Sequence, residues 1–100
     1  MDPAFEALGD ATRRSIMRRL SVSPAAVGDI AAALPVSRPA VSQHLKVLAD
    51  AGLVRAEAAG SRRIYRLDPR GVGAMRDWLD ETWSAAMAAF ATFADTQAEP

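Results

Sequence analysis

The side chains best suited to recognition chemistry lie in one stretch, residues 35–48, which reads PVSRPAVSQHLKVL. Ser37 suits a helix N-cap, and Pro39 falls in the first turn, where a missing N–H group costs no hydrogen bond. The apolar residues recur at the i, i+4, i+7 spacing of one buried stripe, Val41, Leu45 and Leu48. The opposite face carries two cations and two neutral hydrogen-bonding side chains, Arg38, Ser42, Gln43 and Lys46. Such a helix is typical of a reader of the DNA major groove.

The polar face of this helix suggests which side chains meet bases and which meet phosphates. We predict that Ser42 and Gln43 meet base edges, because glutamine can pair bidentately with adenine. Arg38 can read guanine or hold a phosphate, and Lys46 is expected to hold the DNA backbone. His44, the only histidine of the chain, lies at the flank of the apolar stripe. We expect it to pack there or to touch a phosphate, and so to set how the helix lies on the duplex.

A second helix precedes this one and completes a helix-turn-helix unit. It begins at Pro24, and its apolar residues repeat at helical spacing, Val27, Ile30, Ala31 and Leu34. The tight turn over residues 34–37 requires a small side chain near the helix crossing, which Ala31 provides. Gly52 suits the left-handed position that ends the recognition helix. These signals predict a helix-turn-helix over residues 24–51.

Two short runs of strand-forming residues follow, over 53–57 and 62–67, and predict a β-hairpin wing over residues 53–67. Arg62 and Arg63 come directly after the glycine of its tip, so their guanidinium groups can reach a phosphate or a minor groove. The alternative is that both arginines only protect an edge strand from pairing with another chain. The predicted DNA-binding residues are Ser37, Arg38, Ser42, Gln43, His44, Lys46, Arg62 and Arg63.

Two further helical segments precede the helix-turn-helix. A short opening segment holds Phe5 and Leu8, ends at Gly9, and is expected to lie on the C-terminal element. Asp10 is a suitable N-cap for a helix over about residues 11–20. We interpret the arginines of that helix as a solvated face, with phosphate contact as the alternative; they are Arg13, Arg14, Arg18 and Arg19.

A long last helix is predicted to start at Asp68–Pro69 and to extend over residues 69–94. Its apolar residues form more than one stripe, so a second copy of the same helix is the economical cover. The predicted dimer interface comprises Phe5, Leu8, Met75, Trp78, Leu79, Trp83, Ala86, Met87 and Phe90. The alternative role of the aromatic residues is to line a cavity for an apolar effector. Residues 96–100 are expected to form a flexible tail.

Length, composition and charge limit the function classes. The 100 residues suit a single domain, here residues 1–95, and no cysteine is present for disulfides or thiolate metal sites. The chain has no membrane span and no secretory signal, so we expect a cytoplasmic protein, associated with the nucleoid when it binds DNA. Residues 1–70 hold eleven Arg and Lys against seven Asp and Glu, whereas residues 71–100 hold one against five. Only the first part is therefore suited to phosphate.

Neither a catalytic site nor a metal site assembles from the residue types present. An enzyme would need an activated nucleophile or an acid–base pair, and the chain has no cysteine and a single histidine. Asp77, Asp80 and Glu81 share one helix face but offer no nitrogen or sulfur donor, so we interpret them as solvated. We predict a regulator that is not an enzyme and uses no cofactor. The alternatives are a winged-helix module that binds another protein without specific DNA binding, and a small hydrolase.

The predicted elements, mainly α with about five helices and a two-stranded wing, describe a winged helix-turn-helix that dimerises through its terminal helices. Five segments resemble the ArsR family of bacterial repressors, namely residues 7–14, 29–31, 37–48, 51–54 and 60–67. The resemblance implies a homodimer that binds a double-stranded DNA operator with inverted-repeat half-sites. It also implies repression of transcription, in some cases of the repressor's own gene, and release of the DNA when an inducer binds.

The chain differs from the metal-sensing members of the family that it resembles. Many such members bind metals through Cys in the third helix or through His and Asp in the last. Here the third helix has Ala26, Val27 and Gly28, and the last helix has no histidine. The chain therefore resembles the branch of the family without metal ligands, and its inducer is unknown.

Overall fold

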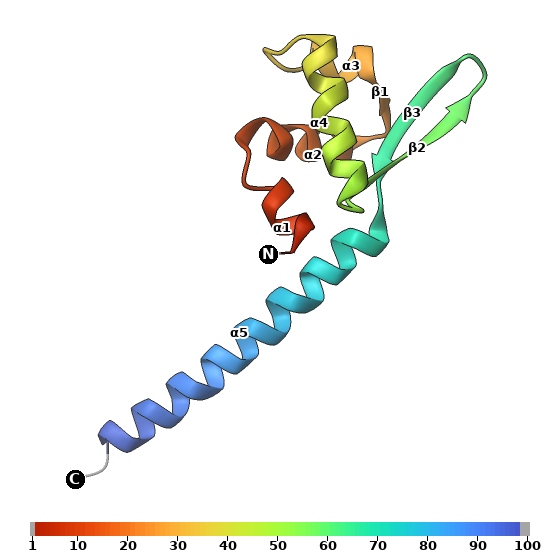
Figure 1. The fold of residues 1–100 in the computed structure, drawn as a ribbon. Coiled ribbons are helices and arrows are strands. Elements are labelled where there is room, and N and C mark those ends of the chain that lie inside the picture. The colour runs from red at the N-terminus through yellow and green to blue at the C-terminus, as the bar shows by residue number, and fades with distance from the viewer. Residues whose placement is uncertain (1, 99–100) are drawn as a thin grey trace.

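The chain folds into a body of short helices and strands, from which one long helix extends (Figure 1). The computed structural model describes residues 2–98. The body comprises α1 (Pro3–Ala7), α2 (Ala11–Val22), β1 (Ala25–Ala26), α3 (Val27–Ala32), α4 (Arg38–Asp50), β2 (Val54–Ala59) and β3 (Arg62–Leu67). The long helix is α5 (Pro69–Ala98). This architecture confirms the predicted fold class, a mainly helical winged helix-turn-helix.

The apolar stripe predicted for α4 forms the centre of the body. Val41, Leu45 and Leu48 are fully buried, together with Ile16 of α2 and Ile30 of α3. The start of α4 follows from its sequence, because the Ser37 hydroxyl accepts a hydrogen bond from the Ala40 N–H at 3.3 Å. The helix ends before Gly52, which has a φ of +77°. Packing of this stripe leaves the polar face of α4 on the outside.

The sheet contains a third strand that the sequence pattern did not predict. The pairs Ala25↔Tyr65 and Ala26↔Ile64 join β1 to β3, so the strand order is β1-β3-β2. The predicted start of the third helix at Pro24 is therefore wrong, and α3 covers only Val27–Ala32. The physical reason is that β3 offers a row of unpaired N–H and C=O groups, which the extended backbone before α3 satisfies.

The wing has the predicted hairpin geometry with a tighter tip. In β2 and β3 the paired residues run from Val54↔Leu67 to Ala59↔Arg62, which leaves only Gly60 and Ser61 in the turn. Gly60 has a φ of +64°, a conformation that favours glycine in a two-residue hairpin loop. The arginines that follow therefore stand at the end of the hairpin.

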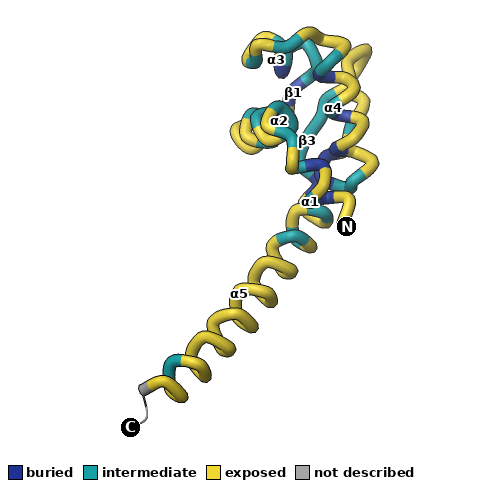
Figure 2. The backbone as a smooth tube through the Cα atoms, turned by 60° about the vertical axis from the view of Figure 1, so that its left-hand side comes forward, coloured by how far each residue is buried: buried dark blue, intermediate teal, exposed yellow. Residues whose placement is uncertain are grey.

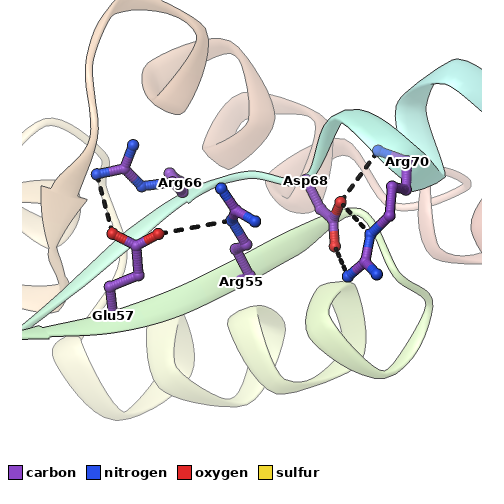
Figure 3. Close-up of polar contacts among 5 residues, drawn as sticks. All are labelled: Arg55, Glu57, Arg66, Asp68 and Arg70. Atoms are coloured by element: carbon purple, nitrogen blue, oxygen red, sulfur yellow. Dashed lines mark hydrogen bonds and ion pairs between the residues drawn. The ribbon is translucent and has the colours of Figure 1, made fainter.

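The helix α5 begins at a close contact with the body. The Asp68 side chain is buried and accepts hydrogen bonds from the N–H and the guanidinium of Arg70 (Figure 3). These bonds from Arg70 hold the pKa of Asp68 below its ordinary value. A Cβ atom on Gly71 would lie 1.8 Å from the Gly52 carbonyl oxygen, so the two backbones meet at this point. Only glycine allows that approach.

Beyond this junction, α5 is exposed along nearly all of its length (Figure 2). It continues to Ala98, past the predicted end at residue 94. Of the predicted tail, residues 96–98 are helical, and residues 99 and 100 lie outside the described part of the chain. No helix within residues 2–98 is both long enough and apolar enough to cross a membrane.

Candidate nucleic-acid interface

The outer face of α4 presents most of the predicted DNA-reading side chains. Arg38, Ser42, Gln43 and Lys46 are exposed, whereas His44 is half-buried at the flank of the stripe. The Lys46 ammonium lies 3.1 Å from the Asp50 carboxylate one turn later, and both side chains remain largely exposed. An exposed ion pair of this kind is weak, so Lys46 can leave the carboxylate and bind a phosphate at little cost in free energy. Ser37 differs from the others because its hydroxyl caps the helix.

A hollow of about 390 Å³ lies where α3, the start of α4 and the tip of the wing meet. Three of the predicted residues line it, Arg38, Arg62 and Arg63. The Arg38 guanidinium lies so close to Gly28 that a Cβ atom there would sit 2.9 Å from its Nη2 atom. The predicted cations of the helix and of the wing are thus brought together, although they are more than twenty residues apart in the sequence.

Each wing arginine is held by a neighbour. The Arg62 guanidinium donates to the Asp29 carboxylate at 2.8 Å, which ties the wing tip to the first turn of α3. The Arg63 guanidinium lies 5.7 Å from the centre of the Tyr65 ring, within the range of a cation–π contact. Both side chains stay exposed. An edge-protecting role alone would not require a carboxylate partner for Arg62, and this contact favours a defined placement of the wing.

Arg13 and His44 form a contact between α2 and the recognition helix. The Arg13 Nη1 atom lies 3.4 Å from His44 Nδ1, and the Arg13 Nε–H donates to the Ala7 carbonyl of α1. The Arg13 backbone N–H also donates to the Asp10 carboxylate at 3.0 Å, and this bond lowers the pKa of Asp10. Arg13 is therefore partly buried and bonded to two neighbouring helices, in contrast to the solvated face that we predicted.

The predicted dimer-interface residues fall into two groups. Leu8 and Met75 pack partly against the body's own core, and Phe5 packs on Trp78 with 5.0 Å between ring centres. The remaining residues line the open surface of α5, where Trp83 is 67% exposed and Phe90 is 63% exposed. These exposed members are Trp78, Leu79, Trp83, Ala86, Met87 and Phe90. A shallow apolar hollow beside Trp83 is also open to solvent on the single chain.

The described residues contain no cluster of three or more His, Cys, Asp or Glu side chains that could hold a metal ion. Sequence reasoning missed three residues that shape the interface, Gly28, Asp29 and Arg13. In the sequence, Asp29 is recognisable only as an acidic residue in the first turn of a helix. Arg13 is recognisable only as an arginine on an exposed helix. Their partners lie 33 and 31 residues away, so no local spacing could have revealed them.

Comparisons with known proteins identify relatives that share this fold. The model for bacterial regulatory proteins of the arsR family matches residues 10–56, from α2 into the wing. The chain is 52% identical over 98 residues to the HTH-type transcriptional regulator Rv2034 of Mycobacterium tuberculosis, covering 98% of this chain and 92% of that protein. It is 30% identical over 79 residues to the transcriptional repressor SdpR of Bacillus subtilis, covering 79% and 88% of the two chains.

A solved structure adds an assembly to compare with. It is the solution structure of a homodimeric winged helix-turn-helix DNA-binding domain from Mycobacterium bovis. Its TM-score with this chain is 0.68 at 26% sequence identity, over 85% of this chain and 79% of that one.

Proposed function

This chain belongs to the ArsR family of bacterial transcriptional regulators, and we propose that it is a homodimeric repressor of an inverted-repeat operator. The observation that carries the proposal is the shared outer surface of α4 and the wing. Exposed Ser42 and Gln43 are flanked there by three arginines around one hollow. Neutral side chains suited to base edges, with cations beside them suited to phosphates, are the combination that sequence-specific DNA binding requires.

The proposed dimer rests on the apolar surface of α5. Several large apolar side chains of this helix are more than 40% exposed, among them Trp78, Trp83 and Phe90. Contiguous apolar surface of this kind marks an interaction site. A second copy provides a matching helix by symmetry, and the relative from Mycobacterium bovis is described as a homodimer.

In the proposed mechanism each protomer lays α4 in the major groove of one half-site. The two recognition helices of the dimer then lie about 34 Å apart, one turn of the duplex. Gln43 pairs with a base edge, and Arg38, Lys46, Arg62 and Arg63 hold phosphates. About four phosphate contacts per protomer predict a slope near −7 for log K against log salt concentration. Such a repressor acts in the cytoplasm, associated with the nucleoid, and the gene that encodes it is a natural target.

The experiment compares Gln43→Ala with Arg62→Ala on a set of duplex variants. The parent duplex covers the region upstream of the protein's own gene. Gln43→Ala should weaken binding by about 1–3 kcal/mol and change the base preference at one position, because a base contact is lost. Arg62→Ala should weaken binding evenly across all variants and reduce the salt slope by about two, because one phosphate contact is lost in each protomer. Fluorescence anisotropy at several salt concentrations measures both effects.

Two outcomes would contradict the proposal. If both variants behave alike across the duplex set, the assigned roles of α4 and the wing are wrong. If no specific complex survives competitor DNA on any bacterial promoter tested, the chain is better described as a winged-helix module that binds another protein through α5. If the repressor role is confirmed, a thermal-shift screen for compounds that also weaken DNA binding would identify the inducer.

A further inference from the structure

The side chain of Arg13 joins three helices of the body. It belongs to α2, its Nε–H donates to the Ala7 carbonyl at the end of α1, and its Nη1 atom lies 3.4 Å from His44 Nδ1 in α4. Arg14, the next residue, donates to the Leu8 carbonyl at 2.8 Å. Arg14 thus makes a similar bond to the turn after α1, but its described contacts do not include the recognition helix. Arg13 and Arg14 can therefore be compared directly, because Arg13 contacts α4 and the described contacts of Arg14 do not reach that helix.

The chemistry of the Arg13–His44 contact determines where the imidazole carries its proton. A guanidinium group has only donors, so a hydrogen bond across this 3.4 Å contact requires that Nδ1 of His44 accept and carry no proton. A neutral imidazole with a bare Nδ1 carries its proton on Nε2, across the ring. The described hydrogen bonds of the imidazole within residues 2–98 comprise only this contact, so no described protein group occupies Nε2–H.

We propose that Arg13 is a positioning residue that holds His44 as a neutral Nε2–H donor for a phosphate oxygen of the DNA. The DNA part of this inference rests on the proposed function, whereas the tautomer is a property of the free protein. The same guanidinium ties the ring to α1, the helix that packs on α5 through Phe5 and Trp78. Position 44 therefore contributes a hydrogen bond to the backbone of the duplex without adding to the charge of the interface.

The first experiment measures the tautomer of His44 in the free, full-length protein. Because the chain has one histidine, the imidazole signals in a long-range ¹H–¹⁵N spectrum are unambiguous. At pH about 8.5, where imidazole is neutral, we expect a fully unprotonated Nδ1 and a protonated Nε2. In Arg13→Gln both nitrogen shifts should move toward the average of the two tautomers, and in Arg14→Gln they should not move. A protonated Nδ1 in the wild type, or equal changes in both variants, would overturn the proposal.

The second experiment measures what the donor does for DNA binding, with two substitutions that mimic different ring nitrogens. A glutamine amide reaches the position of Nε2, whereas an asparagine amide reaches that of Nδ1. His44→Gln should bind the duplex as the wild type does, and His44→Asn should bind about tenfold more weakly, evenly across duplex variants. Neither should change the salt slope, because the lost donor is neutral. Equal affinities for the two variants, or a reduced slope in His44→Gln, would overturn the proposal.

Arg13→Gln should weaken binding of the same duplex by a similar factor to His44→Asn, and Arg14→Gln should leave it within about twofold of the wild type. If Arg13→Gln does not fold, the wild-type tautomer still tests the contact with Arg13, and the two His44 variants still test the Nε2–H donor. If the wild type binds no duplex specifically, the proposed function fails, while the tautomer measurement still accepts or rejects the role of Arg13.

Discussion

The body and α5 differ in how far their apolar side chains are buried. In the body, the stripe of α4 is fully buried, with Leu45 and Leu48 at 0% exposure. On α5, Trp83 and Phe90 are 67% and 63% exposed, although their side chains are larger than those of the core. The difference indicates that the body completes its own core within one chain, whereas α5 is built to be covered by another surface.

Charge separates the same two regions. Residues 1–70 carry an excess of four positive charges, and residues 71–100 carry an excess of four negative charges. A helix with an acidic excess is repelled by phosphate, whereas the basic body is attracted to it. We therefore assign DNA contact to the body and association of the two protomers to α5. Substitutions in each region test these assignments.

The largest expected effect comes from a charge placed on the apolar surface of α5. Trp83→Glu should weaken the dimer by about 4 kcal/mol, roughly a thousandfold, because two symmetry-related rings lose their burial. Sedimentation equilibrium measures the association. Glu81→Gln, two residues away, is the matched control and should leave the dimer intact. A Trp83→Glu protein that still sediments as a dimer would show that the apolar surface of α5 is not the dimer interface.

A core substitution in the body should act on folding. Leu45→Ala should lower the free energy of unfolding by about 3 kcal/mol, because it leaves a cavity at a fully buried position. Val47→Ala, on the same helix and 41% exposed, should cost about 0.5 kcal/mol or less. Urea denaturation at one fixed protomer concentration measures both. Equal losses for the two variants would show that α4 does not form the centre of the core.

The junction between the two regions predicts effects of opposite sign at neighbouring glycines. Gly71→Ala should destabilise the protein by about 1–3 kcal/mol, because the new methyl group would meet the Gly52 carbonyl and force α5 away from the body. Gly73→Ala meets no atom within 4 Å and should stabilise the protein by roughly 0.5–1 kcal/mol, because alanine is the better helix former. Thermal unfolding compares the two variants, and a change of the same sign in both would refute the close contact.

The smallest expected effect is the pH dependence of the same junction. Hydrogen bonds from Arg70 lower the pKa of Asp68 in the folded state, so its contribution to stability is present above the unfolded value of about 3.9. That contribution is lost as the pH falls through the lower, folded value. Asp68→Asn should therefore be less stable than the wild type at pH 7, and the difference should shrink below about pH 4. A difference that is constant with pH in thermal unfolding scans would contradict the ion pair.

Local signals predicted much of the fold, and long-range contacts account for what they missed. The cap at Ser37, the buried stripe of α4 and the left-handed Gly52 each follow from a few neighbouring residues, and all three are present in the structure. The strand at Ala25–Ala26 has no local signal, because alanine is a poor strand former and the edge of β3 decides its conformation.

The candidate site also combines a feature with a local sequence signal and contacts without one. The recognition face of α4 could be predicted from its helical spacing, but the bonds that hold its neighbours join residues 31 and 33 positions apart. The length of α5 was also underestimated, because its alanine-rich end contains neither glycine nor proline before Pro100 to mark a stop.

The distance between the two recognition helices of the free dimer shows whether association through α5 places them one duplex turn apart. The chain has no cysteine, so Ser42→Cys places one spin label on α4 of each protomer, and pulsed dipolar spectroscopy measures their separation. Association through α5 predicts a distribution centred at about 34 Å, one duplex turn. The absence of a dipolar signal at working concentration, or a distribution centred far from one duplex turn, would contradict this arrangement of the dimer.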